Sequence, residues 1–161
     1  MMKINEKQMK QVIKQLTAQK KTIATMESCT GGTLASAITN IPGASEVFQF
    51  GAVTYENAYK IKLGVPQETI ETYTVYSKET AIAMAKAIVR YTNADYGIGI
   101  TGKLNREDPK NEAGKTNEAF VGIYQKANDK ITVFSLEVTE PTREGCKAQI
   151  INAVLEILNT L

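Results

Sequence analysis

The chain has 161 residues, of which 43% are hydrophobic and 22% charged, and this composition indicates one soluble globular domain over residues 1–161. The sequence contains no histidine, which excludes Ser-His-Asp and Cys-His catalysis as well as histidine-ligated metals. A net charge of +2 gives no electrostatic footprint of a nucleic-acid binder, so a nucleic-acid partner is not expected.

The apolar pattern predicts helices and strands that alternate through the first two thirds of the chain. In chain order we expect a helix at 4–20, a strand at 21–26, a helix at 33–39, a strand at 46–55, a helical turn at 56–64, a short helix at 66–70, a helix at 77–90, a strand at 95–101, a polar segment at 102–117, a hairpin of strands at 119–125 and 131–138, and a helix from 141. This order predicts an α/β fold, a three-layer α/β/α sandwich with a mixed β-sheet.

The cysteines and the apolar segments indicate the cellular compartment of the protein. Cys29 and Cys146 have neither metal-type nor redox-type spacing, and two thiols are too few for a zinc site. No apolar stretch approaches the ~20 residues of a membrane span, and no apolar segment of a secretory signal follows the N-terminal lysines. We therefore expect a cytoplasmic protein with reduced thiols and no membrane contact.

The sequence "ESCTGG" at 27–32 joins the first predicted strand to the second predicted helix. Ser28 then lies at the carboxyl edge of the sheet, where open α/β sheets bind ligands, and Thr30, Gly31 and Gly32 lie at a helix N-terminus whose N–H groups can hold a phosphate or an oxyanion. The alternative is that Ser28 or Thr30 caps the helix and the glycines ease the turn. Cys29 is a second candidate nucleophile, but neighbouring residues on extended backbone point opposite ways, so only one of the two faces the site.

Three further segments follow predicted strands or open a helix. "TYENAYK" at 54–60 supplies the Tyr55 phenol and the Lys60 amine, and serine with lysine is one way to activate a hydroxyl without histidine. Thr101 and Gly102 follow the strand at 95–101, and Arg143 opens the last helix, where it can pair with a phosphate or a carboxylate. Taken singly, each of these segments is more typical of a cap, a turn or a solvated surface than of a site.

In combination these segments resemble a known family. The stretch "ESCTGGTLASAITNIPGASEVFQFGAVTYENAYKIKLGV" is similar to the signature half of the CinA C-terminal domain family, and the similarity continues through "VYSKETAIAMAKAI", "ADYGIGITG" and "VGIY". It covers nearly the whole chain. The chain resembles a stand-alone form without the larger N-terminal domain that some relatives carry.

The resemblance implies a nicotinamide mononucleotide deamidase, an amidohydrolase of pyridine-nucleotide salvage that releases nicotinate mononucleotide and ammonia. It implies that Ser28 is the nucleophile, Lys60 its general base and Tyr55 a proton shuttle or orienting group. The substrate pocket implied by the family comprises Thr30, Gly31, Gly32, Asn57, Thr101, Gly102 and Arg143. The resemblance implies no metal and no cofactor, and it implies a homodimer or a larger homo-oligomer.

The chain departs from the family pattern after Gly102. A glycine-rich loop resembling "IAGPGGG" is usual there, followed by Lys-Pro before "VG", whereas this chain has "KLNREDPKNEAGKTNEAFVG" with Ala119-Phe120. Backbone N–H groups of a glycine-rich loop can wrap a phosphate, and this loop cannot do so in the same way. Two expectations follow: Lys103, Arg106 or Lys110 replaces those donors with charge, or the chain is a catalytically altered or inactive nucleotide-binding or regulatory member of the fold.

Overall fold

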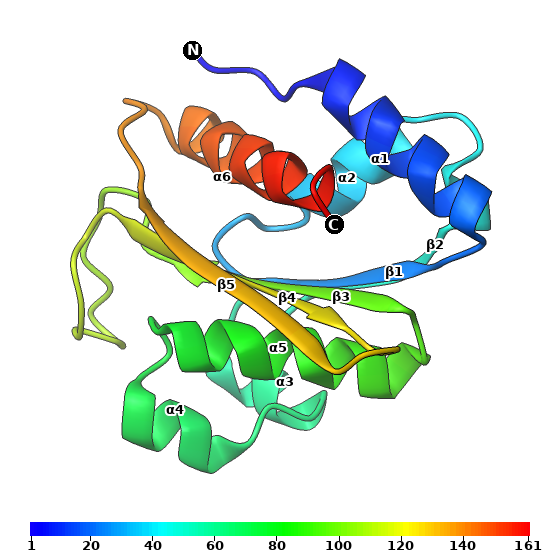
Figure 1. Ribbon diagram of the computed structural model, residues 1–161. Coiled ribbons are helices and arrows are strands. Elements are labelled where there is room, and N and C mark those ends of the chain that lie inside the picture. Colours follow the sequence, from blue (N-terminus) through cyan, green and yellow to red (C-terminus); the bar gives the residue numbers. More distant parts are fainter.

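The computed structural model describes all residues, 1–161, as a five-stranded sheet with helices on both faces (Figure 1). The helices are α1 (Glu6–Gln19), α2 (Thr33–Thr39), α3 (Asn57–Lys62), α4 (Gln67–Tyr73), α5 (Lys78–Thr92) and α6 (Arg143–Leu158), with a 3-10 turn at Ala44–Glu46. The strands are β1 (Ile23–Glu27), β2 (Phe48–Val53), β3 (Tyr96–Gly102), β4 (Glu118–Gln125) and β5 (Lys130–Glu137). Every predicted element is present, with boundaries displaced by a few residues.

The sheet is mixed, with the strand order β2-β1-β3-β4-β5. Strand β1 pairs in parallel with both β2 and β3, whereas β3-β4 and β4-β5 are antiparallel. Helices α1, α2 and α6 cover one face, and α3, α4 and α5 cover the other (Figure 1). The three-layer α/β/α prediction is therefore confirmed, and the carboxyl ends of β1, β2 and β3 lie at one edge of the sheet.

Each face of the sheet packs against its own apolar cluster. The larger cluster joins α1, α2 and α6 to the sheet, and it includes Val12, Leu34, Ile98 and Ile151. On the other face α5 lies directly on β3 and β4, because glycines leave room for its backbone. A Cβ on Gly99 would sit 2.3 Å from the carbonyl oxygen of Ala81. This close packing fixes β3, and with it the segment that follows β3 toward the site.

Ser77 and Gly51 each have a defined role in the local structure. The Ser77 hydroxyl caps α5 by accepting a hydrogen bond from the Thr80 N–H at 3.1 Å. Gly51 sits at an irregularity in the β1-β2 register, and a Cβ there would lie 2.5 Å from the Thr25 hydroxyl oxygen. None of the helices combines the length and the apolar character that a membrane crossing requires.

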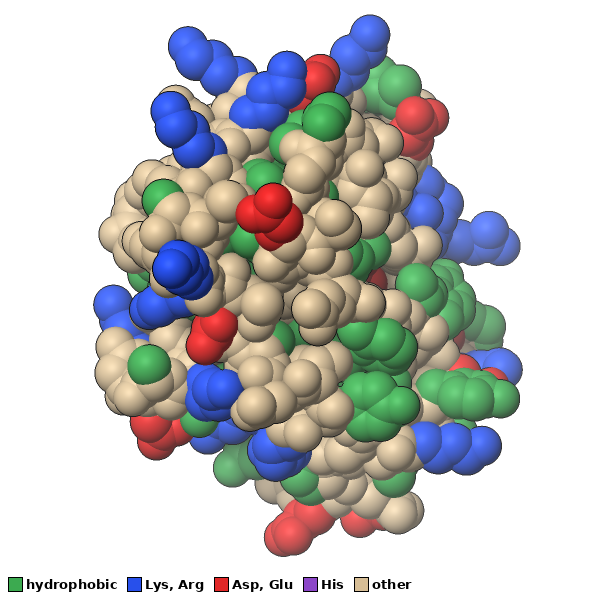
Figure 2. Space-filling model, turned by 90° about the vertical axis from the view of Figure 1, so that its right-hand side faces the viewer, with side chains coloured by type: hydrophobic (Ala, Val, Ile, Leu, Met, Phe, Trp, Pro, Cys, Tyr) green, Lys and Arg blue, Asp and Glu red, His purple; other side chains and the backbone are tan.

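Strand β2 forms one edge of the sheet and carries exposed apolar side chains. Phe50 and Val53 are exposed, and the Phe50 ring lies 5.3 Å from the ring of Tyr91 at the end of α5. Apolar side chains gather in the lower right part of the face seen in Figure 2. The outer edge of β2 has no strand partner within the chain.

Candidate active site

Ser28 lies directly beyond the carboxyl end of β1. Strand β1 ends at Glu27, and the Ser28 N–H donates to the Ile100 carbonyl at 2.9 Å, which ties the residue to the neighbouring strand β3. The residue is 8% exposed. The hydroxyl is thus held on a rigid part of the sheet edge, where the parallel strands β1 and β3 present their carboxyl ends.

Lys60 comes from α3 and reaches the same point, although it lies 32 residues from Ser28 along the chain. Its Nζ is 3.0 Å from the Ser28 Oγ, 2.6 Å from the Thr54 carbonyl oxygen and 3.4 Å from the Tyr55 carbonyl oxygen. The residue is only 1% exposed. The serine hydroxyl and the lysine amine, to which the resemblance gives the roles of nucleophile and base, are therefore in direct contact.

Burial changes the protonation of Lys60. It lowers the pKa of the amino group from 10.5 to about 8, and the negative charges of Cys29 and Asp108, where present, oppose this. No carboxylate forms an ion pair with the amine. Roughly a tenth of the molecules therefore carry a neutral Lys60 near pH 7.

The three oxygens around Lys60 suit both forms of the amine: the charged form donates to all three, including Ser28 Oγ, and the neutral form can do without one of them as an acceptor. The two carbonyl oxygens, of Thr54 and Tyr55, can only accept hydrogen bonds, so they take the two N–H groups of a neutral amine. The nitrogen lone pair is then left for the third partner, the Ser28 hydroxyl. In this state the hydroxyl donates to Nζ, which is the arrangement that a general base needs in order to take the serine proton.

A cavity of about 430 Å³ opens beside this pair, a size typical of ligand pockets. Six of the ten residues proposed from the sequence line it: Ser28, Tyr55, Asn57, Lys60, Gly102 and Arg143. They come from four separate parts of the chain, namely the turn after β1, the segment 54–60, the end of β3 and the start of α6. No group of three or more His, Cys, Asp or Glu side chains is placed to hold a metal ion.

Tyr55 and Asn57 occupy different parts of this cavity. The Tyr55 residue is 65% exposed, and its phenol hydroxyl makes no hydrogen bond within the chain, so the contact with Lys60 comes from its carbonyl group. The Asn57 side chain donates to the Asn111 side chain at 3.0 Å. Tyr55 therefore stands at the rim, and Asn57 ties α3 to the polar segment.

The other four proposed residues do not line the cavity. The Thr101 hydroxyl is buried and donates to the Val75 carbonyl at 3.0 Å. The Thr30 hydroxyl is also buried and donates to the Glu27 carboxylate at 2.6 Å. Gly31 and Gly32 line a different depression, together with Lys147 of α6.

The Glu27 carboxylate explains why the start of α2 is not available to a ligand. It accepts from the N–H groups of Leu34 at 2.9 Å and Ala35 at 3.0 Å, in addition to the Thr30 hydroxyl. Glu27 is 1% exposed. From the sequence, these helix N–H groups were predicted to bind a substrate. In the structure they donate to the Glu27 carboxylate instead.

A Glu27→Ala variant is expected to be strongly destabilised. It would leave the N–H groups of Leu34 and Ala35 and the Thr30 hydroxyl without their acceptor, so the loss is expected to be about 3 kcal/mol. Thermal unfolding should show a midpoint lowered by about 10 °C. Glu156→Ala, which removes an exposed carboxylate without an ion pair, is the matched control. Equal midpoints for the two variants would contradict this role of Glu27.

Cys29 also lines the cavity, contrary to the expectation that only one of the two neighbours faces it. The alternation of a strand does not apply, because β1 ends at Glu27 and the chain turns immediately afterwards. Burial, reinforced by the charge of Glu27, raises the pKa of the Cys29 thiol to about 12. The thiolate is therefore scarce near neutral pH, which leaves Ser28 as the better placed nucleophile.

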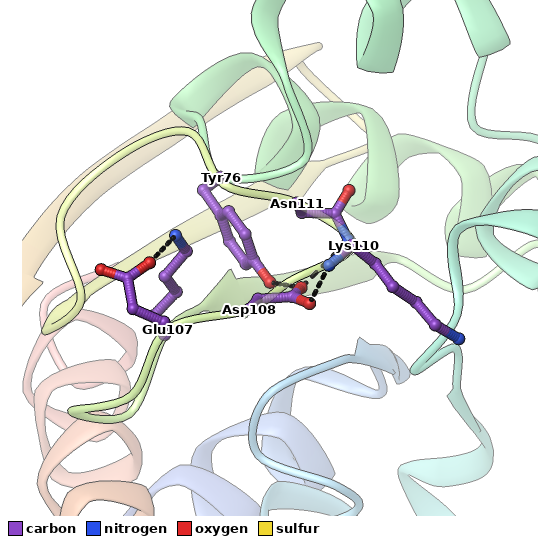
Figure 3. A network of polar contacts seen from close by, with 6 residues as sticks. Tyr76, Glu107, Asp108, Lys110 and Asn111 are labelled. Carbon is purple, nitrogen blue, oxygen red and sulfur yellow. Dashed lines mark hydrogen bonds and ion pairs between the residues drawn. The ribbon is translucent and has the colours of Figure 1, made fainter.

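The polar segment 103–117 borders the cavity and is held by a network that the sequence analysis did not identify (Figure 3). The Tyr76 hydroxyl donates to the Asp108 carboxylate, and Asp108 also accepts from the Asn111 side chain at 3.0 Å. The Lys110 N–H donates to the same carboxylate at 3.0 Å. Burial is the main cause of a raised pKa of the Tyr76 hydroxyl, and the hydrogen bond to Asp108 is the second. The hydroxyl therefore keeps its proton.

Similarity to known proteins identifies the family. The profile of the CinA C-terminal domain matches residues 5–161. The chain belongs to the CinA C-terminal domain family. A putative competence-damage inducible protein of Clostridium acetobutylicum is 39% identical over 145 residues, covering 88% of this chain and 34% of that protein. Another from Thermoanaerobacter pseudethanolicus is 48% identical over 138 residues, covering 83% of this chain and 32% of its own length.

The fold agrees with that of solved CinA-family structures. The competence/damage inducible protein CihA from Agrobacterium tumefaciens superposes with a TM-score of 0.85 at 27% identity, covering 96% of this chain and 93% of that one. The chain spans about a third of the length of the two curated relatives described above. The family resemblance seen in the sequence is thus confirmed over nearly the whole chain.

Proposed function

We propose that the protein is a cytoplasmic amidohydrolase that converts nicotinamide mononucleotide to nicotinate mononucleotide and ammonia. The observation that carries the proposal is the 3.0 Å contact between Ser28 Oγ and the buried Lys60 Nζ, at the wall of a cavity of about 430 Å³. Membership of the CinA C-terminal domain family supports it. The lowered pKa of Lys60 supports the role of this residue as a general base that works near neutral pH.

In the first half of the reaction, the Ser28 oxygen attacks the amide carbon and its proton passes to neutral Lys60. The carbon–nitrogen bond of the tetrahedral intermediate then breaks while Lys60 returns the proton to the leaving nitrogen, and ammonia departs. The Cys29 N–H makes no hydrogen bond to another residue, and because Cys29 lines the cavity we assign this N–H group to the oxyanion. Tyr55, at the cavity rim, is assigned the role of orienting the substrate.

In the second half, water attacks the acyl-serine. Lys60 takes the proton of that water, the bond from the acyl carbon to Ser28 Oγ breaks, and the serine recovers its proton. The net reaction consumes one water and one amide and yields one carboxylate and one ammonium ion. It needs no oxidant or reductant.

The test is direct. Purified protein is incubated with nicotinamide mononucleotide, and both ammonia and nicotinate mononucleotide are quantified. Stoichiometric formation of the two products is the expected result. Saturable binding of the nucleotide without any ammonia would favour the second candidate, a non-catalytic nucleotide-binding or regulatory protein. The observation behind that candidate is the sequence of residues 102–120, in which the glycine-rich loop of the family is replaced.

The proposal includes self-association into a homodimer or a larger homo-oligomer. Its support is the unpaired outer edge of β2, with the exposed side chains of Phe50 and Val53 and the adjoining Tyr91 ring. Apolar side chains exposed along an unpaired strand edge are typical of association surfaces. Light scattering at micromolar concentration should give at least twice the mass of the chain, and Phe50→Lys should lower it. A monomer at all concentrations would contradict self-association.

A further inference from the structure

Lys103 is a second buried lysine in the cavity, and the mechanism above does not use it. It follows Gly102 at the end of β3, and its side chain is 1% exposed. Its Nζ has no hydrogen-bond partner anywhere in the chain. A buried cation without a hydrogen-bonded partner is unfavourable for folding, so its presence points to a ligand that the chain itself does not supply.

Two groups adjoin the Lys103 cation. The Tyr76 ring centroid lies 5.0 Å from Nζ, and the Glu107 carboxylate lies 3.9 Å away. The Glu107 side chain is 72% exposed, so this ion pair is long, screened and weak. In contrast, the Tyr76 ring is fixed by the hydrogen bond to Asp108 (Figure 3). One neighbour of the cation is therefore held firmly, and the other is easily displaced.

The cavity as a whole favours an anion. Four cationic side chains line it, those of Lys60, Lys103, Arg106 and Arg143, against the carboxylates of Glu107 and Asp108. Asp108 is occupied by the hydrogen bonds from Tyr76, Asn111 and the Lys110 N–H. Glu107 is thus the one carboxylate of the cavity that an incoming anion can replace without breaking a hydrogen bond.

We propose that Lys103 binds the phosphate of a phosphomonoester substrate and that Glu107 is the resident counter-ion which this phosphate displaces. The inference rests on the proposed function, in that it assigns the phosphate end of the nucleotide to the segment 103–107. A side-chain cation here supplies the charge that backbone donors of a glycine-rich loop would otherwise provide. The amide end of the same substrate lies toward Ser28 and Lys60.

The two residues make predictions of opposite sign. Lys103→Met removes the cation with little change in side-chain length, and it should weaken binding of ribose 5-phosphate at least tenfold. Glu107→Gln removes the competing charge and should strengthen it several-fold. Lys115→Met, on the same segment, is the matched control, because Lys115 pairs with Glu137 at the surface and should leave binding unchanged. Calorimetric titration of each folded variant measures the affinities.

The choice of probe distinguishes a phosphomonoester from free phosphate. It also tests the phosphate subsite independently of the proposed release of ammonia. Ribose 5-phosphate and inorganic phosphate test the subsite without any turnover, and nicotinamide riboside, which lacks the phosphate, should bind equally to wild type and Lys103→Met. Tighter binding of ribose 5-phosphate than of inorganic phosphate supports a phosphomonoester, and the reverse order overturns that assignment. Binding unaffected by both substitutions overturns the subsite even if ammonia is released; loss of binding in Lys103→Met upholds it even if no ammonia is found.

Thermal unfolding distinguishes ligand binding from a structural role. Since Nζ has no hydrogen-bond partner to lose, Lys103→Met is expected to unfold at a temperature no lower than wild type in the absence of ligand. Phosphate should raise the unfolding temperature of wild type but not of this variant. A variant that unfolds well below wild type without ligand would assign Lys103 to the fold and overturn the proposal.

Discussion

A Ser28→Ala variant is expected to lose ammonia release from nicotinamide mononucleotide by at least about three orders of magnitude, because no other nucleophile replaces the hydroxyl. Binding of the nucleotide should survive, since Lys60, Lys103 and Arg143 keep their places around the cavity. Ammonia release under saturating substrate measures the first effect, and calorimetric titration measures the second.

Ser36→Ala is the matched control for this experiment. Ser36 lies on α2, exposed and remote from the cavity lining, so its removal should leave both turnover and binding unchanged. Turnover of Ser28→Ala above about a tenth of the wild-type rate would remove Ser28 from the mechanism. Cys29, which also lines the cavity, would then be the residue to substitute next.

The sequence predicts the framework of this site because local rules act there. Strand β1 is a short apolar run, α5 begins at a serine cap, and the carboxyl edge of parallel strands is where ligands bind. Local rules of this kind do not predict the pairing of Ser28 with Lys60. No periodicity joins residues 32 positions apart; the chemistry of serine with lysine made the pair a candidate, and the family resemblance assigned the two roles.

What the sequence analysis missed depends on three-dimensional competition for partners. Thr30 and the N–H groups of α2 looked available to a substrate, but the last residue of β1, Glu27, points its carboxylate at them. Tyr76 precedes a helix cap and has no motif of its own, yet its ring lies beside Lys103 and its hydroxyl anchors Asp108. Such assignments require knowing which polar groups are already satisfied.

A Lys60→Met variant is expected to release ammonia about three orders of magnitude more slowly than wild type near neutral pH. Methionine is of similar length but cannot accept the serine proton. The same proton transfer determines the expected pH profile of the wild-type protein. The base must be neutral, and its pKa is lowered to about 8, so kcat/KM should rise about tenfold per pH unit below 8 and level off above it. A profile that is flat between pH 6 and 9 would argue for another base.

Lys62→Met is the matched control for Lys60→Met. Lys62 lies on the same helix α3, and its amine lies 4.7 Å from the exposed Tyr59 ring, outside the cavity. This variant should keep the wild-type rate and the wild-type pH profile. A parallel loss of activity in both variants would indicate damage to α3 and not the loss of a base.

The lowered pKa of Lys60 also makes a prediction about stability that does not depend on the substrate. Between pH 8 and 10.5 this amine is protonated in the unfolded chain but not in the folded chain. The free energy of unfolding of wild type therefore increases with pH across this range, and below pH 8 this increase is absent. The full difference amounts to about 3 kcal/mol. Urea unfolding of wild type and Lys60→Met at pH 7 and at pH 10 measures this effect. The free energy of unfolding of the variant, relative to that of wild type, should be higher at pH 7 than at pH 10. Parallel curves would mean that burial leaves the amine with its ordinary pKa, and the neutral base on which the mechanism depends would be lost.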